Sequence, residues 1–236
     1  MFDRLPLLAL LVAVSLPAGA APAPSQRNYS VTSFDRIRID GPYQVRLRTN
    51  VSPFARATGS PASLDGLSVA VEGRTLIVRA DSGSWGGYAG EGRGPVTIEL
   101  GTHDLGTAWI NGSGALTIDR VKGLSFDLNI QGAGVAKIDH AEVDQMKVGI
   151  SGTGSARLAG SAKKLTAIIR GTSAFEGDAL TANDAVIGAE GPVVIRATVT
   201  NSAKVDALGV ASVTLGGNPA CTTRAHGSAV VTGCKE

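Results

Sequence analysis

The chain is short of aromatic side chains, cysteine, methionine, histidine and charge of one sign. Of its 236 residues only 4% are aromatic, a share that fits a chain of small side chains and frequent turns. Its formal net charge is only +2, and basic and acidic residues are interspersed along it. The sequence therefore contains no basic stripe for nucleic acid and no basic amphipathic helix for a membrane surface.

Long apolar runs are also missing, except at the beginning of the chain. Residues 5–16 are almost wholly apolar, and Pro17 interrupts them well short of the roughly 18 residues that a membrane span needs. Ala18-Gly19-Ala20 has the form of a signal-peptidase site. We therefore expect a signal peptide over residues 1–20 and a flexible lead-in over 21–32, with no transmembrane segment after cleavage. Because no cysteine lies near the cleavage site, we expect no lipid anchor, and the mature protein should be periplasmic, secreted or at the cell surface.

Glycine, in contrast, is abundant, with 31 residues, and much of it belongs to an internal repeat. Four similar segments, each preceded by Ile, are followed by a fainter fifth, and their starts lie 20, 20, 19 and 18 residues apart. The segments are residues 111–114 (NGSG), 131–134 (QGAG), 151–154 (SGTG), 170–173 (RGTS) and 188–191 (GAEG). A repeat of this length decides the architecture before any single motif does.

Apolar residues alternate with polar ones on both sides of each segment. Phe126, Leu128 and Ile130 lead into one copy, and Ala136 and Ile138 lead out of it. A period of two indicates strands with one buried face, and the glycines suit sharp corners between them. About 20 residues are too few for a helical repeat, and a leucine-rich repeat would need regular Leu and a buried Asn. The sequence predicts an all-β, parallel β-solenoid (β-helix-like) fold with about 20 residues per coil and Gly-rich corners.

This fold makes specific predictions about the interior and the domain bounds. One β-solenoid domain should span residues 33–236, with its repeats over 110–200. Equivalent aliphatic side chains should point inward and stack from coil to coil. They are Ile110, Ile130, Ile150, Ile169 and Ile187 before the corners, and Ile118, Ile138, Leu158 and Ile195 after them.

The only two cysteines, Cys221 and Cys234, lie in the last 16 residues of an exported chain. We predict that they form a disulfide, worth about 3 kcal/mol in the chain-entropy model. Redox catalysis or metal binding is disfavoured, because there is no C-x-x-C motif and His226 is the only nearby histidine. A disulfide-closed cap over residues 216–236 would cover the strand edges at the open end of the solenoid.

Several segments, taken in order, resemble the head GIN-domain family of bacterial exported proteins, described as putative auto-transporter adhesins. Residues 33–47 resemble that family's first hairpin, and the resemblance extends over about residues 33–233. The matching segments are 33–47 (SFDRIRIDGPYQVRL), 64–78 (LDGLSVAVEGRTLIV), 96–100 (VTIEL), 110–114 (INGSG), 216–219 (GGNP) and 226–229 (HGSA). The resemblance implies a β-solenoid and an adhesin-like role, and it provides no catalytic residues to transfer.

The candidate binding residues are aromatic. A Gly-rich insertion over residues 81–94 contains Trp85, Tyr88 and Arg93. Trp109 directly precedes the inward Ile110, so its side chain should point to the outer surface of the strand, as those of the insertion could. Aromatic faces bind sugar rings and apolar partners well and dominate binding hot spots. The structural alternative is a connecting loop whose aromatic side chains pack against the solenoid.

Acidic residues recur after three of the strands, at Asp119, Asp139 and Asp178, but Ala159 takes that position in the coil between the last two. Stacked carboxylates could bind Ca²⁺ or serve acid–base chemistry, although residues of this type after a strand are also common turn formers. The three histidines, His103, His140 and His226, have no ligand spacing. We therefore expect no metal site, no cofactor and no catalytic residues.

The sequence leaves three hypotheses about function. The first is a non-enzymatic envelope protein that binds a glycan or a protein partner on an extended β-solenoid face. The second is a carbohydrate-active enzyme, a polysaccharide lyase or hydrolase, on a parallel β-helix. The third is a structural or sensory envelope module with no small ligand.

Overall fold

Each glycine repeat forms a corner at which the chain turns from one side of a coil to the next. β10 (Val121–Gly132) ends in one copy, and β11 (Val135–Gly152) begins just after it and ends in the next. The backbone φ is +108° at Gly132 and +124° at Gly152, a region that favours glycine. A Cβ on Gly152 would also lie 2.5 Å from the carbonyl oxygen of Gly132, so the corners stack too closely for a side chain.

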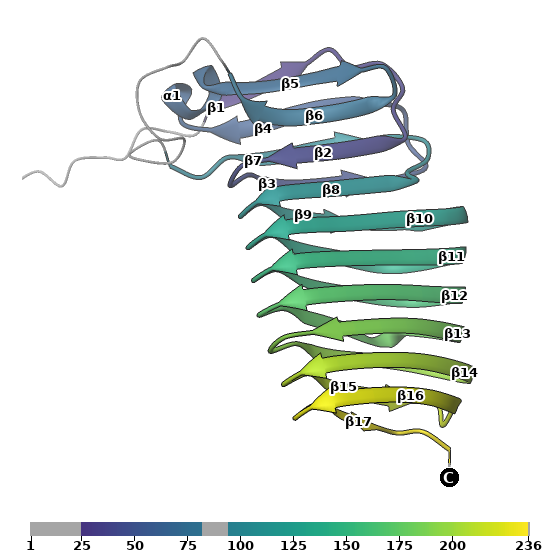
Figure 1. The fold of residues 1–236 in the computed structure, drawn as a ribbon. Helices are drawn as coiled ribbons and strands as arrows, with labels where there is room; N and C mark the ends of the chain where they lie inside the picture. Colours follow the sequence, from purple (N-terminus) through teal and green to yellow (C-terminus); the bar gives the residue numbers. More distant parts are fainter. Residues whose placement is uncertain (1–24, 82–93, 236) are drawn as a thin grey trace, which may run out of the picture.

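The computed structural model describes residues 25–81 and 94–235, which form stacked parallel coils of about 20 residues (Figure 1). Strands make up 72% of the chain and helix 3%, so the predicted all-β solenoid is confirmed. Ile130 pairs with Ile150, and Ile150 pairs with Ile169, in the register of the parallel strands. The remaining repeat strands are β8 (Thr107–Gly112), β9 (Ala115–Ile118), β12 (Ser155–Gly171), β13 (Ala174–Glu190), β14 (Val194–Gly209), β15 (Ser212–Gly216), β16 (Ala220–Gly227) and β17 (Val230–Thr232).

Two sheets run the length of the stack. The front sheet, which faces the viewer in Figure 1, contains β8, β16 and the C-terminal parts of β10 to β14. The back sheet contains β9, β15, β17 and the N-terminal parts of β11 to β14. A short third side, at the right in Figure 1, begins with residues 121–123 and 141–143 and leads back to the front sheet.

The first coil of the chain is not at the end of the stack. β2 (Arg36–Asp40) pairs in parallel with β8 on one side and β6 (Thr75–Ala80) on the other. Behind it, β3 (Gln44–Arg48) pairs in the same way with β9 and β7 (Thr97–Gly101). The hairpin expected over residues 33–47 is therefore wrong. β2 and β3 form two sides of one coil, because their hydrogen bonds go to the coils above and below rather than to each other.

Antiparallel strands close the N-terminal end of the stack. β5 (Leu67–Glu72) pairs with β6, β4 (Phe54–Gly59) pairs with β7, and β1 (Ser25–Tyr29) pairs with β4, each in antiparallel orientation. The short helix α1 (Pro61–Asp65) lies beside them, and its N-cap Ser60 accepts a hydrogen bond from the backbone N–H of Ser63 at 3.2 Å. No helix in residues 25–81 or 94–235 is long and apolar enough to span a bilayer.

The interior is the predicted aliphatic ladder. All nine predicted side chains are at most 2% exposed, which confirms their inward orientation. Two larger rings, Phe126 and Phe175, are also fully buried. The Phe175 ring fills the space beside Gly177, where a Cβ would lie 2.8 Å from it. The Phe175 ring therefore makes up for the side chain that is missing at Gly177, two residues along the same strand.

The fifth repeat begins two residues later than the sequence suggested. Arg170 pairs with Glu190, so the fifth corner is residues 190–193 and not 188–191. Ile187 consequently stacks on Ala167, and Ala189 takes the place below Ile169. Because the error is two residues, the inward face is preserved, and Ile187 is only 1% exposed.

The C-terminal segment adds a last coil, whereas we had expected it to fold over the open end as a cap. β16 continues the front sheet beyond β14, and β17 continues the back sheet beyond β15. The predicted Cys221–Cys234 disulfide is confirmed. Cys221 pairs with the buried Ala203 of the preceding coil, and both cysteines pack against the end of the core. The disulfide therefore closes the last coil from within.

Candidate functional site

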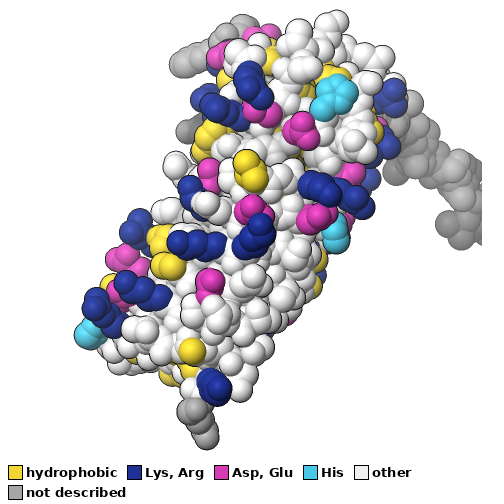
Figure 2. Space-filling view, turned by 90° about the vertical axis from the view of Figure 1, so that its right-hand side faces the viewer, with side chains coloured by type: hydrophobic (Ala, Val, Ile, Leu, Met, Phe, Trp, Pro, Cys, Tyr) yellow, Lys and Arg dark blue, Asp and Glu magenta, His cyan; other side chains and the backbone are white. Residues whose placement is uncertain are grey.

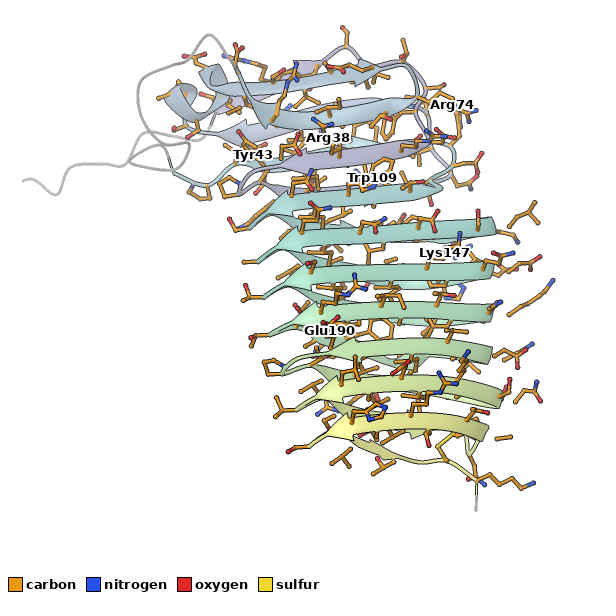
Figure 3. The ribbon with its side chains drawn as sticks, in the orientation of Figure 1. Arg38, Tyr43, Arg74, Trp109, Lys147 and Glu190 are labelled. Atoms are coloured by element: carbon orange, nitrogen blue, oxygen red, sulfur yellow. A yellow bond between two sulfur atoms is a disulfide. The ribbon has the colours of Figure 1, made fainter. Side chains whose placement is uncertain are left out.

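Trp109 lies on the outer surface of the front sheet. It is half-buried on β8, between the buried Ala108 and Ile110, so its side chain points away from the core. In the register of the sheet it has Arg38 of β2 above it and Asn129 of β10 below it. Figure 3 shows Trp109 and Arg38 on this front surface.

The outward positions in line with Trp109 form what we call the central column. It runs across seven strands of the front sheet and contains two glycines. From β8 to β16 it consists of Trp109, Asn129, Gly149, Ile168, Gly188, Asp206 and Arg224.

Each glycine of the central column marks a depression in the sheet. The first hollow, of about 520 Å³, is lined by outward residues and by apolar residues of the same strands. The outward residues are Asp127, Asn129, Gln131, Lys147, Gly149, Ser151, Thr166, Ile168 and Arg170, and the apolar ones are Leu128, Ile130, Val148 and Ile150. The second hollow, of about 350 Å³, is lined in the same way by Ile168, Ile169, Arg170, Val186, Ile187, Gly188, Ala189, Glu190, Lys204, Asp206 and Leu208. Ile168 borders both and separates them. The front sheet therefore carries two adjacent hollows in one line.

Backbone conformation does not require these two glycines. Unlike Gly132 and Gly152 at the corners, neither Gly149 nor Gly188 has a positive φ. A Cβ on Gly149 would meet only the tip of the Asn129 side chain closely, with its Oδ1 at 2.8 Å. A Cβ on Gly188 would meet Ile168 Cδ1 at 3.0 Å. Glycine weakens a strand interior and often marks a place where a ligand approaches the backbone.

Charged side chains around the hollows are paired across neighbouring strands. Lys147 Nζ lies 3.8 Å from Asp127 Oδ1, and Arg170 Nε lies 3.1 Å from Glu190 Oε2. Figure 3 shows Lys147 and Glu190 on the front surface, towards its right and left sides. Asp127 Oδ1, the oxygen beside Lys147, is buried and has no hydrogen-bond partner among the described residues.

Amide and hydroxyl groups supply the other polar contacts in the first hollow. Asn129 and Gln131 each offer donors and an acceptor, and so do the hydroxyls of Ser151 and Thr166.

At the edge of the sheet, Asp184 of β13 accepts hydrogen bonds from Ser202 Oγ at 2.5 Å and Asn201 Nδ2 at 2.7 Å. These bonds, that of Ser202 first, lower the pKa of the Asp184 carboxyl.

The structure places only one of the four predicted binding residues. Trp85, Tyr88 and Arg93 lie outside the described residues, so the expectation that they share a surface with Trp109 stays a prediction. The described chain stops at Asp81, just after β6, and resumes at Gly94, just before β7. The hollows were not predicted. The available signal was the pair of glycines at outward strand positions, where neighbouring coils carry Asn129, Ile168 or Asp206.

The recurring carboxylates do not form a common site. Asp119 Oδ1 accepts a hydrogen bond from the backbone N–H of Thr49 at 3.0 Å. Asp139 pairs with Lys137 at 2.6 Å. Among residues 25–81 and 94–235 no group of three or more His, Cys, Asp or Glu side chains could hold a metal ion. These aspartates serve local contacts at the ends of strands.

The third side of the coils has a different character from the front sheet. Figure 2 shows Lys and Arg interspersed with Asp and Glu on this side of the molecule. Lys122 pairs with Glu142 at 3.2 Å, and Lys163 pairs with Asp144 at 2.7 Å. Exposed pairs of this kind contribute little to stability. This surface has charges but no aromatic residue, and we take the front sheet as the candidate site.

Comparison with known proteins supports this architecture. The family model described as "Putative auto-transporter adhesin, head GIN domain" matches residues 33–219. A crystal structure of a putative adhesin from Bacteroides fragilis has a TM-score of 0.76 and 20% sequence identity, covering 90% of this chain and 96% of that one. A putative lipid binding protein from Parabacteroides distasonis has a TM-score of 0.68 and 17% identity, covering 88% and 95%. A search of curated proteins found no significant match. At these identities the structural likeness shows the fold alone.

Proposed function

Because the chain belongs to the putative auto-transporter adhesin, head GIN domain family, we propose that it is an exported, non-enzymatic protein of the bacterial envelope that binds a partner on its front sheet. The partner is a glycan or a surface protein. The observation that carries the proposal is the pair of hollows at Gly149 and Gly188, in line with Trp109. Concave sites with a few convergent polar groups are where ligands bind.

Binding, rather than catalysis, suits the carboxylates of this surface. A glycosidase needs one carboxyl group as an acid and a second as a base or nucleophile, on either side of the scissile bond. On the front sheet, Asp127 and Glu190 instead lie beside Lys147 and Arg170, each of which neutralises one carboxylate. This pairing favours a binding protein over a polysaccharide lyase or hydrolase.

A lipid surface is a less suitable partner. One structural neighbour is named a putative lipid binding protein, so the alternative is specific enough to test. In this chain, however, the exposed large hydrophobic side chains are divided among different sides. Leu124 follows the first strand segment of the third side, and Ile168 and Leu208 lie on the front sheet. Val135, Val194 and Val230 lie on the back sheet, separated by the small residues of the coils between them, and Val210 follows β14. A membrane-binding face would instead gather them into one patch.

The test measures adhesion of the mature chain, residues 21–236, to intact bacterial cells, a glycan array and phospholipid vesicles. A front-sheet variant, Gly149→Val, is compared with Gly216→Val, which places the same side chain at an exposed glycine at the end of β15 in the back sheet. We expect binding that Gly149→Val lowers and Gly216→Val does not, with no new reducing ends or unsaturated products. Equal binding by both variants would refute a front-sheet site, and product formation would favour the enzyme.

The aromatic residues of the Gly-rich segment add a separate prediction. If Trp85 and Tyr88 contribute with Arg93, replacing both aromatics with alanine should weaken binding at least about thirtyfold, the effect of losing about 2 kcal/mol. The measurement is the affinity of the double variant for the partner found above, with circular dichroism as the control for folding. Unchanged affinity would limit the binding site to the front sheet.

A further inference from the structure

We propose that the partner is a neutral, unbranched glycan that lies along the central column, across the strands, with sugar rings at Trp109, the first hollow and the second hollow. This inference rests on the proposed function and names the chemical class of the ligand. It begins with the spacing of these three positions. Gly149 lies two strands below Trp109, and Gly188 lies two strands below Gly149. Since neighbouring strands are about 4.8 Å apart, three equivalent positions recur about every 10 Å.

A regular row of positions suits a polymer with a regular repeat. In an unbranched glycan with alternating ring orientation, every second ring presents the same face to the protein. Rings placed two strands apart would therefore meet the row of Trp109, Gly149 and Gly188 in the same way. Asn129 and Ile168, the residues between these positions, would lie beneath the intervening rings.

The surfaces along the column match the two faces of a sugar ring. Trp109 offers an aromatic face, on which the C–H face of a sugar can stack. Ile168, with 36% of its surface exposed, offers an aliphatic contact at the ridge between the hollows. At the two glycines only the side-chain tips of Asn129 and Ile168 come close to where a Cβ would lie, so a ring that displaces these tips can approach the backbone.

Both flanks of the column can hydrogen-bond to hydroxyl groups. On one flank are the Asp127 carboxylate and the hydroxyl of Thr166. On the other are Gln131 and Ser151. A ligand that carries hydroxyls along both edges would satisfy these groups over successive strands.

The charges around the two hollows favour a neutral ligand. Their lining contains three cationic side chains, Lys147, Arg170 and Lys204, and three carboxylates, Asp127, Glu190 and Asp206. Two of the cations already lie beside a carboxylate, at 3.8 and 3.1 Å. An acidic polysaccharide would have to compete with these carboxylates for the same cations, which a neutral one avoids.

A protein partner fits this surface less well. The centre of a protein interface is usually apolar and depleted of charge. Here six charged side chains lie among the apolar residues that line the two hollows, and Ile168 and Leu208 are the exposed large apolar side chains of that lining. The front sheet therefore favours a glycan.

The test titrates the mature chain with neutral cello-, manno- and chito-oligosaccharides of two to eight rings by calorimetry, with alginate and hyaluronate oligosaccharides as acidic probes. We expect a neutral series to bind, with affinity that rises with length until the ligand spans Trp109 and both hollows. Gly149→Val, Gly188→Val and Trp109→Ala should each weaken binding at least about tenfold, or about 1.4 kcal/mol. The control Gly216→Val should bind like the wild type.

Three results would overturn the inference, and they differ in what they say of the proposed function. If only the acidic probes bind, the neutral glycan is refuted and the front-sheet site is kept. The same holds if no glycan binds while Gly149→Val still lowers adhesion to cells. Neutral glycan binding that none of the three variants changes would refute this site. If Gly149→Val fails to fold, Gly149→Ala with Trp109→Ala provides the same comparison with a smaller side chain.

Discussion

Two glycines three residues apart on β11 are there for different reasons. At the corner, Gly152 has a φ of +124°, and a Cβ would lie 2.5 Å from the carbonyl oxygen of Gly132. On the front sheet, Gly149 has no positive φ, and a Cβ would closely approach only the side-chain tip of Asn129. The corner glycine is required by the path of the chain. The front-sheet glycine leaves a hollow that the chain itself does not need.

This difference separates shape from function in a repeat protein. The corners recur in every coil because each corner stacks on the one before it. On the front sheet, the two hollows lie where Gly149 and Gly188 replace the side chains that neighbouring coils carry in the central column. The most regular feature of the sequence therefore builds the solenoid, and departures from regularity give one surface its chemistry.

The largest expected effect comes from the residue between the two glycines. Ile150 is 2% exposed and stacks between Ile130 and Ile169. Ile150→Ala should lower the free energy of unfolding by about 2–5 kcal/mol, because it removes buried methyl groups and leaves a cavity. Chemical denaturation measures the loss. The neighbouring outward variant Ser151→Ala should stay within about 0.5 kcal/mol of the wild type, and an equal loss in both variants would contradict the inward register.

The coil formed by β16 and β17 is closed by the Cys221–Cys234 disulfide. Replacing Cys221 and Cys234 with serine should destabilise the protein by about 3 kcal/mol in the chain-entropy model. The measurement is the denaturation midpoint of the double variant against oxidised wild type. Reduced wild type is the matched control and should behave like the double variant. Two cysteines open to alkylation in unreduced protein would show that the bond does not form.

At the corner, Gly152→Ala should cost about 2 kcal/mol or more, because a positive φ strains alanine by about 1–3 kcal/mol and the stacked carbonyl must also move. Thermal unfolding compares this variant with Gly149→Ala on the same strand. A corner variant as stable as the wild type would remove the distinction between the two kinds of glycine.

The smallest effect on stability is expected at the front sheet. Gly149→Ala should change the free energy of unfolding by no more than about 0.5 kcal/mol, since glycine is itself unfavourable in a strand and the Asn129 side chain can move aside. Denaturation and the glycan titration, made on the same preparation, separate stability from binding. A loss of binding that merely followed a loss of stability would argue against a specific hollow.

The solenoid itself could be predicted because its signals are local. The period of two around Ile130 and Ile150 and the recurring glycine corners define strands, corners and coil length. The fifth corner was misplaced by two residues because Gly191 was matched to the second glycine of the repeat, whereas it stacks on Gly171, which is the first. Only the pairing of Arg170 with Glu190 across neighbouring coils shows this. The position of β2 and β3 between later coils depends on long-range pairing that no local pattern contains.

The candidate site could be predicted only in part. Trp109 was identified because an outward aromatic residue is conspicuous in a chain with few aromatics. The hollows were missed because Gly149 and Gly188 are two glycines among 31, and their effect depends on the side chains that the neighbouring coils place around them. Surface shape of this kind requires the register between coils, which is known only once the chain is folded.

The most direct test of the front-sheet site uses Trp109 as its own reporter. The chain contains two tryptophans, so Trp85→Phe leaves Trp109 as the only one. Titrating this variant with the neutral oligosaccharide that binds best should shift the emission of Trp109 with the same affinity that calorimetry gives. The added variant Gly149→Val should abolish the shift. Emission that stays unchanged while calorimetry still detects binding would show that the ligand binds elsewhere and would contradict the account.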